Sequence, residues 1–407
     1  MEIPDTSRTA AVAVIAQQTV YPILFSIAFA HLLNDLLQAV IPAAYPILKE
    51  TYNLTFTQIG LITFAYQLAA SILQPVVGLY TDRYPKPFSQ IFGMLFTLTG
   101  IVSLSFADSF RMIIMSVVLV GIGSSIFHPE ASRISFLASG GRRGLAQSIF
   151  QLGGNIGTAI GPLLVALIVV PNTQRYIIGF AIVAVAGLAV LTHIARWYQL
   201  HLSMRASVRP LVVLPDLSQT RIVLSVALLL VLIFSKFFYV ASISSYFIFY
   251  LIEKFGLSIQ DAQFHLFLFL AACAVGTLIG GPLGDKFGRK YVIWFSVLGV
   301  APFTLLLPYA DLFWTTALSV VIGIIISSAF PAILVYAQEL LPKKLGMVSG
   351  LFYGFAFGMG GLGSALLGRL ADQRGILYVY ELCGWLPLIG IIAVFLPNLK
   401  KKPLVFK

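Results

Sequence analysis

Four polar side chains interrupt an apolar stretch of the sequence at HLLNDLLQ. They are His31, Asn34, Asp35 and Gln38. Spacings of three and four residues place all four on one face of a helix. Because a carboxylate within an apolar, membrane-type helix is costly and usually functional, we expect Asp35 and His31 to exchange protons. We expect Asn34 and Gln38 to face a bound solute, and a closed hydrogen-bond network between helices is the alternative.

A second group of ionisable residues stands near the end of another apolar stretch, in the segment FHPEASR. Pro129 interrupts the helical hydrogen-bond ladder and can leave backbone groups facing a cavity. Glu130 and Arg133 are three positions apart and can pair on a helix. We expect Glu130 to take part in proton exchange, and His128 and Arg133 to contact the solute. A structural Glu130–Arg133 salt bridge is the alternative.

Two stripes of residues run along the segment 144–170. Gln147, Gln151 and Asn155 recur every four positions, and glycines recur with the same period between 153 and 161. The stripes lie on different faces because they are offset by two positions. We expect Gln151 and Asn155 to line a cavity while the glycines pack closely against a neighbouring helix, although both stripes also fit a plain packing seam.

A single lysine stands within the apolar residues 221–251. Lys236 shares a helical face with Tyr239 and Tyr246. A cation inside a membrane can attract an anion or pair with Asp35, so we predict that these three residues bind substrate. Alternatively, the long lysine side chain extends to the membrane surface.

The composition supplies the setting for these residues. Hydrophobic residues make up 59% and charged residues 10% of the chain, and the mean hydropathy is +0.94, whereas a soluble domain carries about 25% charged residues. We infer an integral membrane protein, and the length of the apolar stretches indicates helices rather than a β-barrel. The predicted spans are 21–46, 56–80, 88–107, 111–138, 144–170, 175–195, 221–251, 263–283, 291–309, 313–340, 346–368 and 377–397.

The distribution of basic residues predicts the orientation. Of 26 lysines and arginines, 19 lie in the N-terminal segment, the even-numbered loops and the C-terminal segment, and six lie in the odd-numbered loops. By the positive-inside rule we expect both termini in the cytoplasm. These cations are dispersed among short loops, so the net charge of +11 does not indicate nucleic-acid binding. No signal peptide is predicted at the N-terminus, and the first span is expected to direct insertion.

No residue pattern predicts an enzyme or a metalloprotein. Cys273 and Cys383 lie in apolar stretches outside any recognised motif. The spacings GxSxG and HExxH, which mark common hydrolase sites, do not occur. We therefore expect no catalytic residues, no metal ion and no cofactor.

The chain contains an internal repeat. SSIF at 124–127 matches SSAF at 327–330, 203 positions later, and GLAQSIF at 144–150 matches GMVSGLF at 346–352. Several matches at nearly one offset argue against chance and predict two six-helix halves, the architecture of major facilitator transporters, which alternate access to a midplane site. The predicted segments are a cytoplasmic tail at 1–20, a first bundle at 21–195, a cytoplasmic linker at 196–220, a second bundle at 221–397 and a basic cytoplasmic tail at 398–407.

A loop motif repeats at the same spacing. The chain reads GLYTDRYPKP and later GPLGDKFGRKY, and Asp82 and Asp285 are 203 positions apart. Both copies resemble the Gly-x-x-x-Asp-Arg/Lys loop signature of the major facilitator superfamily, with two prolines departing from it in the first. A carboxylate there can sit against a helix N-terminus, and the resemblance implies a latch between the halves; a role in topology alone is the alternative. The implied latch residues are Gly78, Asp82, Arg83, Gly281, Asp285, Lys286 and Arg289.

Longer segments resemble the fosmidomycin-resistance branch of that superfamily. They include HLLNDLLQ, GSSIFHPEASR, GLAQSIFQLGGNIG and GGPLGDKFGRKYVIW, and such stretches run from the first predicted span to the eleventh. The segment 157–162 is similar to the antiporter motif of drug:proton exchangers. The resemblance implies a monomeric, multi-pass protein of the bacterial inner membrane. It further implies proton-coupled antiport that exports small anionic drugs such as the phosphonate fosmidomycin.

Transport in the opposite direction is the alternative function on the same fold. A facilitator or a proton symporter that imports a small organic anion would use the same polar faces. The direction of transport cannot be read from residue types, so this alternative stays open. In either case the expected partners are the lipid bilayer, a small-molecule substrate and, where coupled, protons.

Overall fold

The computed structural model describes residues 19–205 and 217–399, and every regular element in these ranges is helical. The first half comprises α2 (Tyr21–Ala43), α3 (Tyr45–Tyr52), α4 (Phe56–Arg83), α5 (Ser89–Ser105), α6 (Phe110–Ala138), α7 (Arg143–Leu164), a π-helical turn (Val165–Val169), a 3₁₀ segment (Gln174–Phe180) and α8 (Ala181–Arg205). The second half comprises α9 (Gln219–Phe255), α10 (Ile259–Phe287), α11 (Arg289–Leu298), α12 (Ala301–Leu306), a 3₁₀ turn (Leu307–Tyr309), α13 (Leu312–Ser327), α14 (Ala329–Leu340), α15 (Leu345–Arg374), α16 (Ile376–Cys383) and a 3₁₀ segment (Leu386–Phe395). The predicted all-helical fold class is confirmed.

Among the described residues, eleven helical segments are long and apolar enough to cross a membrane. The shorter α5 occupies the position of the predicted third span, so the pattern agrees with twelve spans. The predicted span 313–340 is divided at Ser328 into α13 and α14. Pro331 has no N–H to continue the ladder across this break, and the Ser327 carbonyl instead accepts a hydrogen bond from the Thr277 hydroxyl at 3.3 Å.

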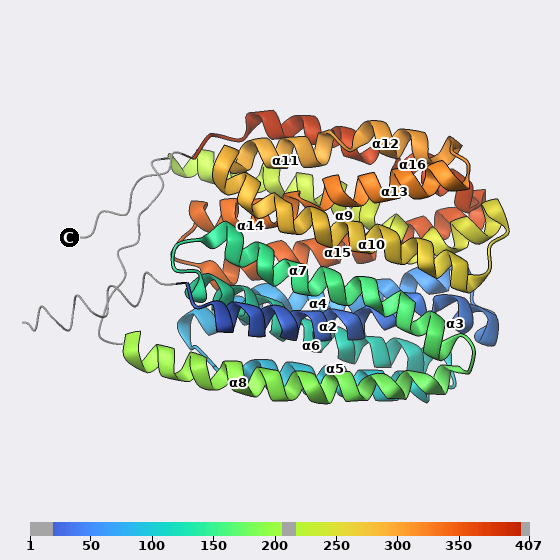
Figure 1. The fold of residues 1–407 in the computed structure, drawn as a ribbon, viewed down its shortest axis with the longest axis horizontal. Coiled ribbons are helices and arrows are strands. Elements are labelled where there is room, and N and C mark those ends of the chain that lie inside the picture. Colours follow the sequence, from blue (N-terminus) through green and yellow to red (C-terminus); the bar gives the residue numbers. More distant parts are fainter. Residues whose placement is uncertain (1–18, 206–216, 400–407) are drawn as a thin grey trace, which may run out of the picture.

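The two halves lie side by side with their helices running along the same direction. Figure 1 shows the first half in blue to green below the second half in yellow to red, with α7 and α10 and also α4 and α15 meeting between them. The described chain begins and ends at the same end of the bundle (Figure 1). The interface between the halves is therefore built mainly from two helix pairs.

Small residues allow α4 and α15 to approach closely. A Cβ atom on Gly78 would overlap the carbonyl of Gly346, and one on Gly354 would lie 2.6 Å from the carbonyl oxygen of Ser71. Helices in lipid gain no hydrophobic energy from association, so close backbone packing has to supply the attraction. This glycine-lined seam holds the two halves together.

The helices extend beyond several predicted segment limits. Helix α8 continues to Arg205 and α9 begins at Gln219, within the predicted linker 196–220. Residues 206–216 of that linker lie outside the described residues, as do 1–18 and 400–407 of the two predicted tails.

Candidate functional site

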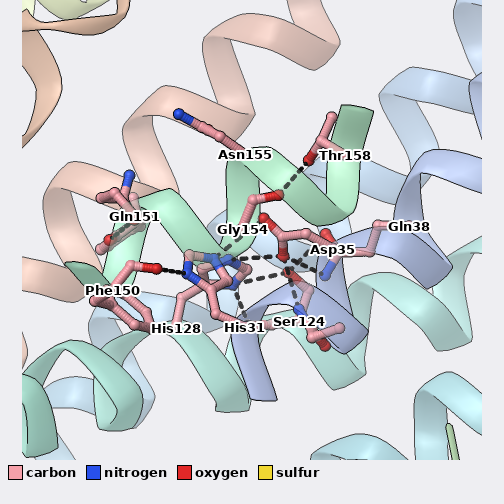
Figure 2. A network of polar contacts seen from close by, with 12 residues as sticks. His31, Asp35, Gln38, Ser124, His128, Phe150, Gln151, Gly154, Asn155 and Thr158 are labelled. Atoms are coloured by element: carbon pink, nitrogen blue, oxygen red, sulfur yellow. Dashed lines mark hydrogen bonds and ion pairs between the residues drawn. The ribbon is translucent and has the colours of Figure 1, made fainter. Parts of the chain in front are cut away.

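Asp35 lies at the centre of a polar cluster between α2 and α6 (Figure 2). Its carboxylate oxygens contact His31 Nε2 at 3.1 Å and His128 Nε2 at 3.5 Å. The side-chain amides of Asn34 and Gln38 donate hydrogen bonds to Asp35 Oδ1 at 3.0 and 3.4 Å. Both histidines are buried, whereas the Asp35 side chain is 18% exposed. The polar face predicted for α2 therefore converges on Asp35, and α6 adds His128 to it.

Backbone carbonyls fix the tautomers of both histidines. His31 Nδ1 lies 2.8 Å from the Phe150 carbonyl oxygen, and His128 Nδ1 lies 3.1 Å from that of Ser124. Because a carbonyl oxygen only accepts hydrogen bonds, each Nδ1 carries a hydrogen and each Nε2 is turned to Asp35. A proton between an Nε2 and the carboxylate can reside on either group. The cluster can thus gain or lose a proton while both backbone bonds stay in place.

The cluster continues through Gln38 to two other helices. Gln38 Oε1 accepts hydrogen bonds from the Tyr66 hydroxyl on α4 and, at 3.4 Å, from the Ser124 hydroxyl on α6. These bonds orient the Gln38 amide nitrogen toward Asp35. The protonation state of one carboxylate is therefore connected to α2, α4 and α6.

Helix α7 closes over the cluster at a glycine. A Cβ atom on Gly154 would lie 2.5 Å from His31 Nε2 and 2.7 Å from Asp35 Oδ2, well inside van der Waals contact. Figure 2 shows Gly154 directly beside these side chains. Any larger residue here would displace the histidine or the carboxylate, so Gly154, which adjoins the glycine stripe of α7 without belonging to it, shapes the Asp35 cluster.

The cluster also offers a donor set of the kind that divalent metal ions use. One atom each from His31, Asp35 and His128 lies within 4.8 Å of the others. Each imidazole Nε2 lies near a different oxygen of the carboxylate, at 3.1 and 3.5 Å. His31 Nε2 is buried without a well-aligned hydrogen bond among the described residues. The same three atoms can therefore share protons or hold a cation.

Glu130 and Arg133 point to the end of α4 rather than to Asp35. Arg133 donates to the Thr81 carbonyl and lies 3.5 Å from Glu130 Oε1 and 3.9 Å from Asp82 Oδ1. Glu130 is buried, at 1% exposure. The pair thus has the geometry of a salt bridge, and Arg133 joins α6 to the predicted latch.

The first loop motif places Asp82 against the N-terminus of α15. Its two carboxylate oxygens accept hydrogen bonds from the backbone N–H groups of Gly346 at 3.1 Å and Met347 at 2.9 Å. The first N–H groups of a helix have no partner within it, and the helix dipole favours a negative charge there. Arg83, by contrast, is exposed and lies over the Tyr84 ring.

The second loop motif has the equivalent position on the other helix pair. Asp285 lies close to Gly144 in the first turn of α7, where an added Cβ would be 2.6 Å from the carboxyl carbon. Arg289 contacts Asp285 at 3.1 Å and Glu339 at 2.7 Å. Lys286 lies over the neighbouring phenylalanine ring at 5.2 Å. A Cβ on Gly281 would overlap α7.

A third carboxylate, which the sequence reasoning missed, caps the opposite end of the α4–α15 pair. Asp372 accepts hydrogen bonds from the N–H groups of Phe56 at 3.0 Å and Thr57 at 2.8 Å, and from the Thr57 hydroxyl at 2.5 Å. The signal was present, because Gly368 and Asp372 repeat the Gly-x-x-x-Asp spacing of the loop motifs. Helices α4 and α15 therefore cap each other at both ends.

Neutralising each cap is expected to loosen a different end of the α4–α15 pair. Asp372→Asn weakens the bonds to the Phe56 and Thr57 amides, and Asp82→Asn those to the Gly346 and Met347 amides. Hydrogen bonds to charged groups contribute about 1.5–3 kcal/mol, so each variant is expected to raise hydrogen–deuterium exchange at its own helix start by about tenfold or more. Each variant is the matched control for the other, and exchange that rises equally at both ends contradicts two independent caps.

Lys236 is buried between aromatic rings of α9 and α14. Its Nζ atom lies 5.3 Å from the Phe237 ring centre and 5.4 Å from that of Phe330, and the residue is 5% exposed. It forms no ion pair within residues 19–205 and 217–399, so the Asp35–Lys236 pair is absent there. The ammonium also does not extend to the surface, because cation–π contact with two rings holds it inside.

Asn155 approaches the Lys236 region from the other half. Its side-chain amide donates to the Cys273 carbonyl at 3.3 Å and to the Thr277 hydroxyl at 2.5 Å on α10. The Cys273 side chain lies within electrostatic range of Lys236. Asn155 on α7 and Lys236 on α9 therefore each approach Cys273, Asn155 at its backbone carbonyl and Lys236 at its side chain.

The remaining predicted substrate residues are distributed along the interface between helices. Gln151 accepts a hydrogen bond from the Tyr353 hydroxyl at 2.6 Å. Tyr246 donates to the Ser364 carbonyl at 2.6 Å, which ties α9 to α15. Tyr239 is buried at 2% exposure, and its hydroxyl has no hydrogen-bond partner in the part of the chain that the structure describes.

The fold and these interfaces define a membrane transporter of two six-helix halves. The family model described as Major Facilitator Superfamily matches residues 27–262 and 229–407, so the chain belongs to this superfamily. The chain is 55% identical over 401 residues to the fosmidomycin resistance protein of Escherichia coli (strain K12), covering 98% of this chain and 99% of that protein. The resemblance to that branch of the superfamily is confirmed.

Other relatives agree with this placement. An uncharacterized MFS-type transporter of Bacillus subtilis (strain 168), YfnC, is 43% identical, covering 94% of both chains. The crystal structure of the human organic anion transporter MFSD10 (TETRAN) has a TM-score of 0.72 at 14% identity, covering 93% of this chain and 100% of that one. The outward conformation of FucP has a TM-score of 0.65 at 16% identity, covering 94% and 100%. These solved structures share the fold.

Proposed function

We propose that this protein is a proton-coupled exporter of small organic anions, with fosmidomycin as a substrate. One observation carries the proposal: the first helix of each half holds a buried ionisable site. On α2 it is Asp35 between two histidines, and on α9 it is Lys236, which has no acid partner within residues 19–205 and 217–399. Ionisable groups inside a membrane protein mark ion and substrate pathways. The 55% identical relative named for fosmidomycin resistance supports the choice of substrate.

The proton acts at the cluster of Asp35, His31 and His128. In the outward-facing state the cluster takes up a proton from the outer side, and in the inward-facing state it releases it to the cytoplasm. Protonation removes the energetic cost of enclosing a carboxylate and permits the halves to reorient. Because protons flow inward, an anion that exchanges with them is driven outward.

The anion binds between the halves near Lys236. The ammonium supplies the charge, and the amide of Asn155, which lies close to Cys273, supplies a hydrogen-bond donor. Reorientation exposes this site alternately to each side. When the halves separate during transport, we propose that the substrate also contacts Asn34, Gln38, His128, Arg133, Gln151, Tyr239 and Tyr246. Glu130 serves as a second proton site.

We also propose the cellular setting. The protein lies in a bacterial inner membrane with both termini in the cytoplasm, which agrees with the 19 basic residues assigned to cytoplasmic segments. It works as a monomer of two bundles, 21–195 and 221–397, with the loop aspartates Asp82 and Asp285 as conformational latches.

The test is drug export with and without a proton gradient. Expression in a bacterial host without its own efflux pumps is expected to raise the fosmidomycin concentration needed to stop growth. In everted membrane vesicles, an acidic interior is expected to drive fosmidomycin accumulation. Equal counterflow with and without the gradient would identify a facilitator, and accumulation only with an alkaline interior would identify a symporter; either result replaces the proposal.

A further inference from the structure

Tyr353 of α15 contacts both sides of the interface between the halves. Its hydroxyl donates to Gln151 Oε1 at 2.6 Å and accepts from Gln147 Nε2 at 3.1 Å, both on α7. Its ring lies 5.2 Å from the His128 ring on α6. The side chain is buried at 3% exposure. A residue of the second half is therefore packed on the proton-sharing cluster of the first.

Phe330 connects Tyr353 to the buried ammonium. The Phe330 and Tyr353 rings are 5.1 Å apart at an interplanar angle of 70°, an edge-to-face contact. The opposite contact of Phe330 is with Lys236, whose Nζ atom lies 5.4 Å from the ring centre. The contacts thus run without interruption from Lys236 through Phe330 and Tyr353 to His128 and so to Asp35.

Few ionisable side chains near Asp35 could connect its protonation to the second six-helix half. His31 lies on the same helix and His128 on α6, and the tyrosines within electrostatic range are Tyr66 on α4 and Tyr353 on α15. Of these, Tyr353 is the residue from the second half. Phe357, also on α15, contacts His128 as well, with ring centres 5.0 Å apart. Tyr353 differs from it in carrying a hydroxyl and in contacting Phe330, so the route from Lys236 through Phe330 reaches the cluster at Tyr353.

We propose that Tyr353 is a positioning residue that couples anion binding at Lys236 to proton release from the Asp35 cluster. The inference rests on the proposed exporter function and names its coupling element. An anion that pairs with the ammonium draws it from the Phe330 ring, and Phe330 repacks against Tyr353. Because hydrogen bonds to Gln147 and Gln151 hold the Tyr353 hydroxyl on α7, they determine the direction in which the Tyr353 ring shifts against the His128 ring.

Coupling of this kind is reciprocal. If the anion lowers the affinity of the cluster for a proton, protonation lowers the affinity for the anion by the same factor. Antiport requires that sign, because both ligands bound together would be carried in one direction. Wild-type protein is therefore expected to bind fosmidomycin more tightly as the pH rises, and to release protons on binding.

Tyr353→Phe tests the proposal because it keeps the ring and removes the hydroxyl. We expect the variant to bind fosmidomycin within about threefold of wild type at high pH. This affinity alone does not distinguish a coupling role from a purely structural role of the tyrosine. The pH dependence of the dissociation constant and the proton release measured with an indicator dye are both expected to be lost. Phe330→Leu, which removes the ring between the two sites, is expected to give the same loss.

Tyr380→Phe is the matched control. Tyr380 is equally buried and its hydroxyl donates to the Ser242 carbonyl at 2.9 Å, outside the proposed route. The control is expected to keep the wild-type pH profile. Retention of the pH profile by Tyr353→Phe, or by Phe330→Leu, overturns the coupling role and leaves the exporter intact. A wild-type protein whose fosmidomycin binding is absent or independent of pH overturns the proposed function, and the coupling role with it.

Discussion

Asp35→Asn is expected to reduce fosmidomycin accumulation driven by a pH gradient to the level of vesicles without the protein. Asparagine has nearly the same shape, and its side-chain oxygen can still accept the hydrogen bonds that Asn34 and Gln38 donate to Asp35. It cannot, however, carry a negative charge or take up a proton. The expected loss is therefore one of energy coupling rather than of folding.

The measurement compares two transport modes in everted vesicles. Gradient-driven accumulation is expected to disappear, while counterflow of labelled against unlabelled fosmidomycin at uniform pH continues, because exchange of substrate needs no net proton movement. Asp108→Asn, which neutralises an exposed carboxylate just before α6, is the control and is expected to leave both modes unchanged. Gradient-driven accumulation by the Asp35→Asn protein at the wild-type rate would exclude Asp35 as the coupling acid.

The repeat and the apolar periodicity were sufficient to predict the helices and the two halves. These features are local, or depend on one constant offset, so they can be read along a single chain. The same holds for the polar face of α2, where helical spacing alone places Asn34 and Gln38 beside Asp35. Asp82 at a helix N-terminus also follows from a short motif and the helix dipole.

Contacts between residues on different helices could not be predicted in this way. His128 comes to Asp35 because α6 packs on α2. The sequence showed it only in one segment with Glu130 and Arg133, whose contacts go elsewhere. Helical spacing determines which residues share a face but not which residue opposes them. Tyr353 was missed for this reason, since an isolated tyrosine in a glycine-rich helix carries no signal of its own. Asp372 was missed although its Gly-x-x-x-Asp spacing was visible, because it lies in a predicted outer loop.

Lys236→Met is expected to weaken fosmidomycin binding by about 10- to 100-fold. Methionine retains most of the aliphatic volume between the Phe237 and Phe330 rings, so packing changes little while the charge is lost. An ion-paired hydrogen bond to an anion contributes about 1.5–3 kcal/mol, which corresponds to that range of affinity. Lys236→Arg is expected to recover part of the affinity, because it restores the charge with a different shape.

Binding can be measured through the native residue Cys273, by the rate at which its thiol is alkylated. Because the Cys273 side chain lies within electrostatic range of Lys236, a bound anion is expected to slow its alkylation by a membrane-permeant maleimide in a Cys383→Ser background. This protection is expected at much higher fosmidomycin concentrations in Lys236→Met. Lys254→Met is the matched control, because that ammonium already donates to the carbonyls of Pro308 and Ala310 at 2.7 and 2.8 Å.

The two lysines separate a charge needed for binding from one needed for structure. Lys254 has backbone acceptors, so its removal is expected to affect stability and to leave the concentration dependence of protection unchanged. Lys236 lies between rings with no acid partner among the described residues, and we expect a bound anion to stabilise a charge in this position. Equal protection in wild type and Lys236→Met would mean that the anion binds elsewhere, and the loss of protection in both lysine variants would point to a change in folding.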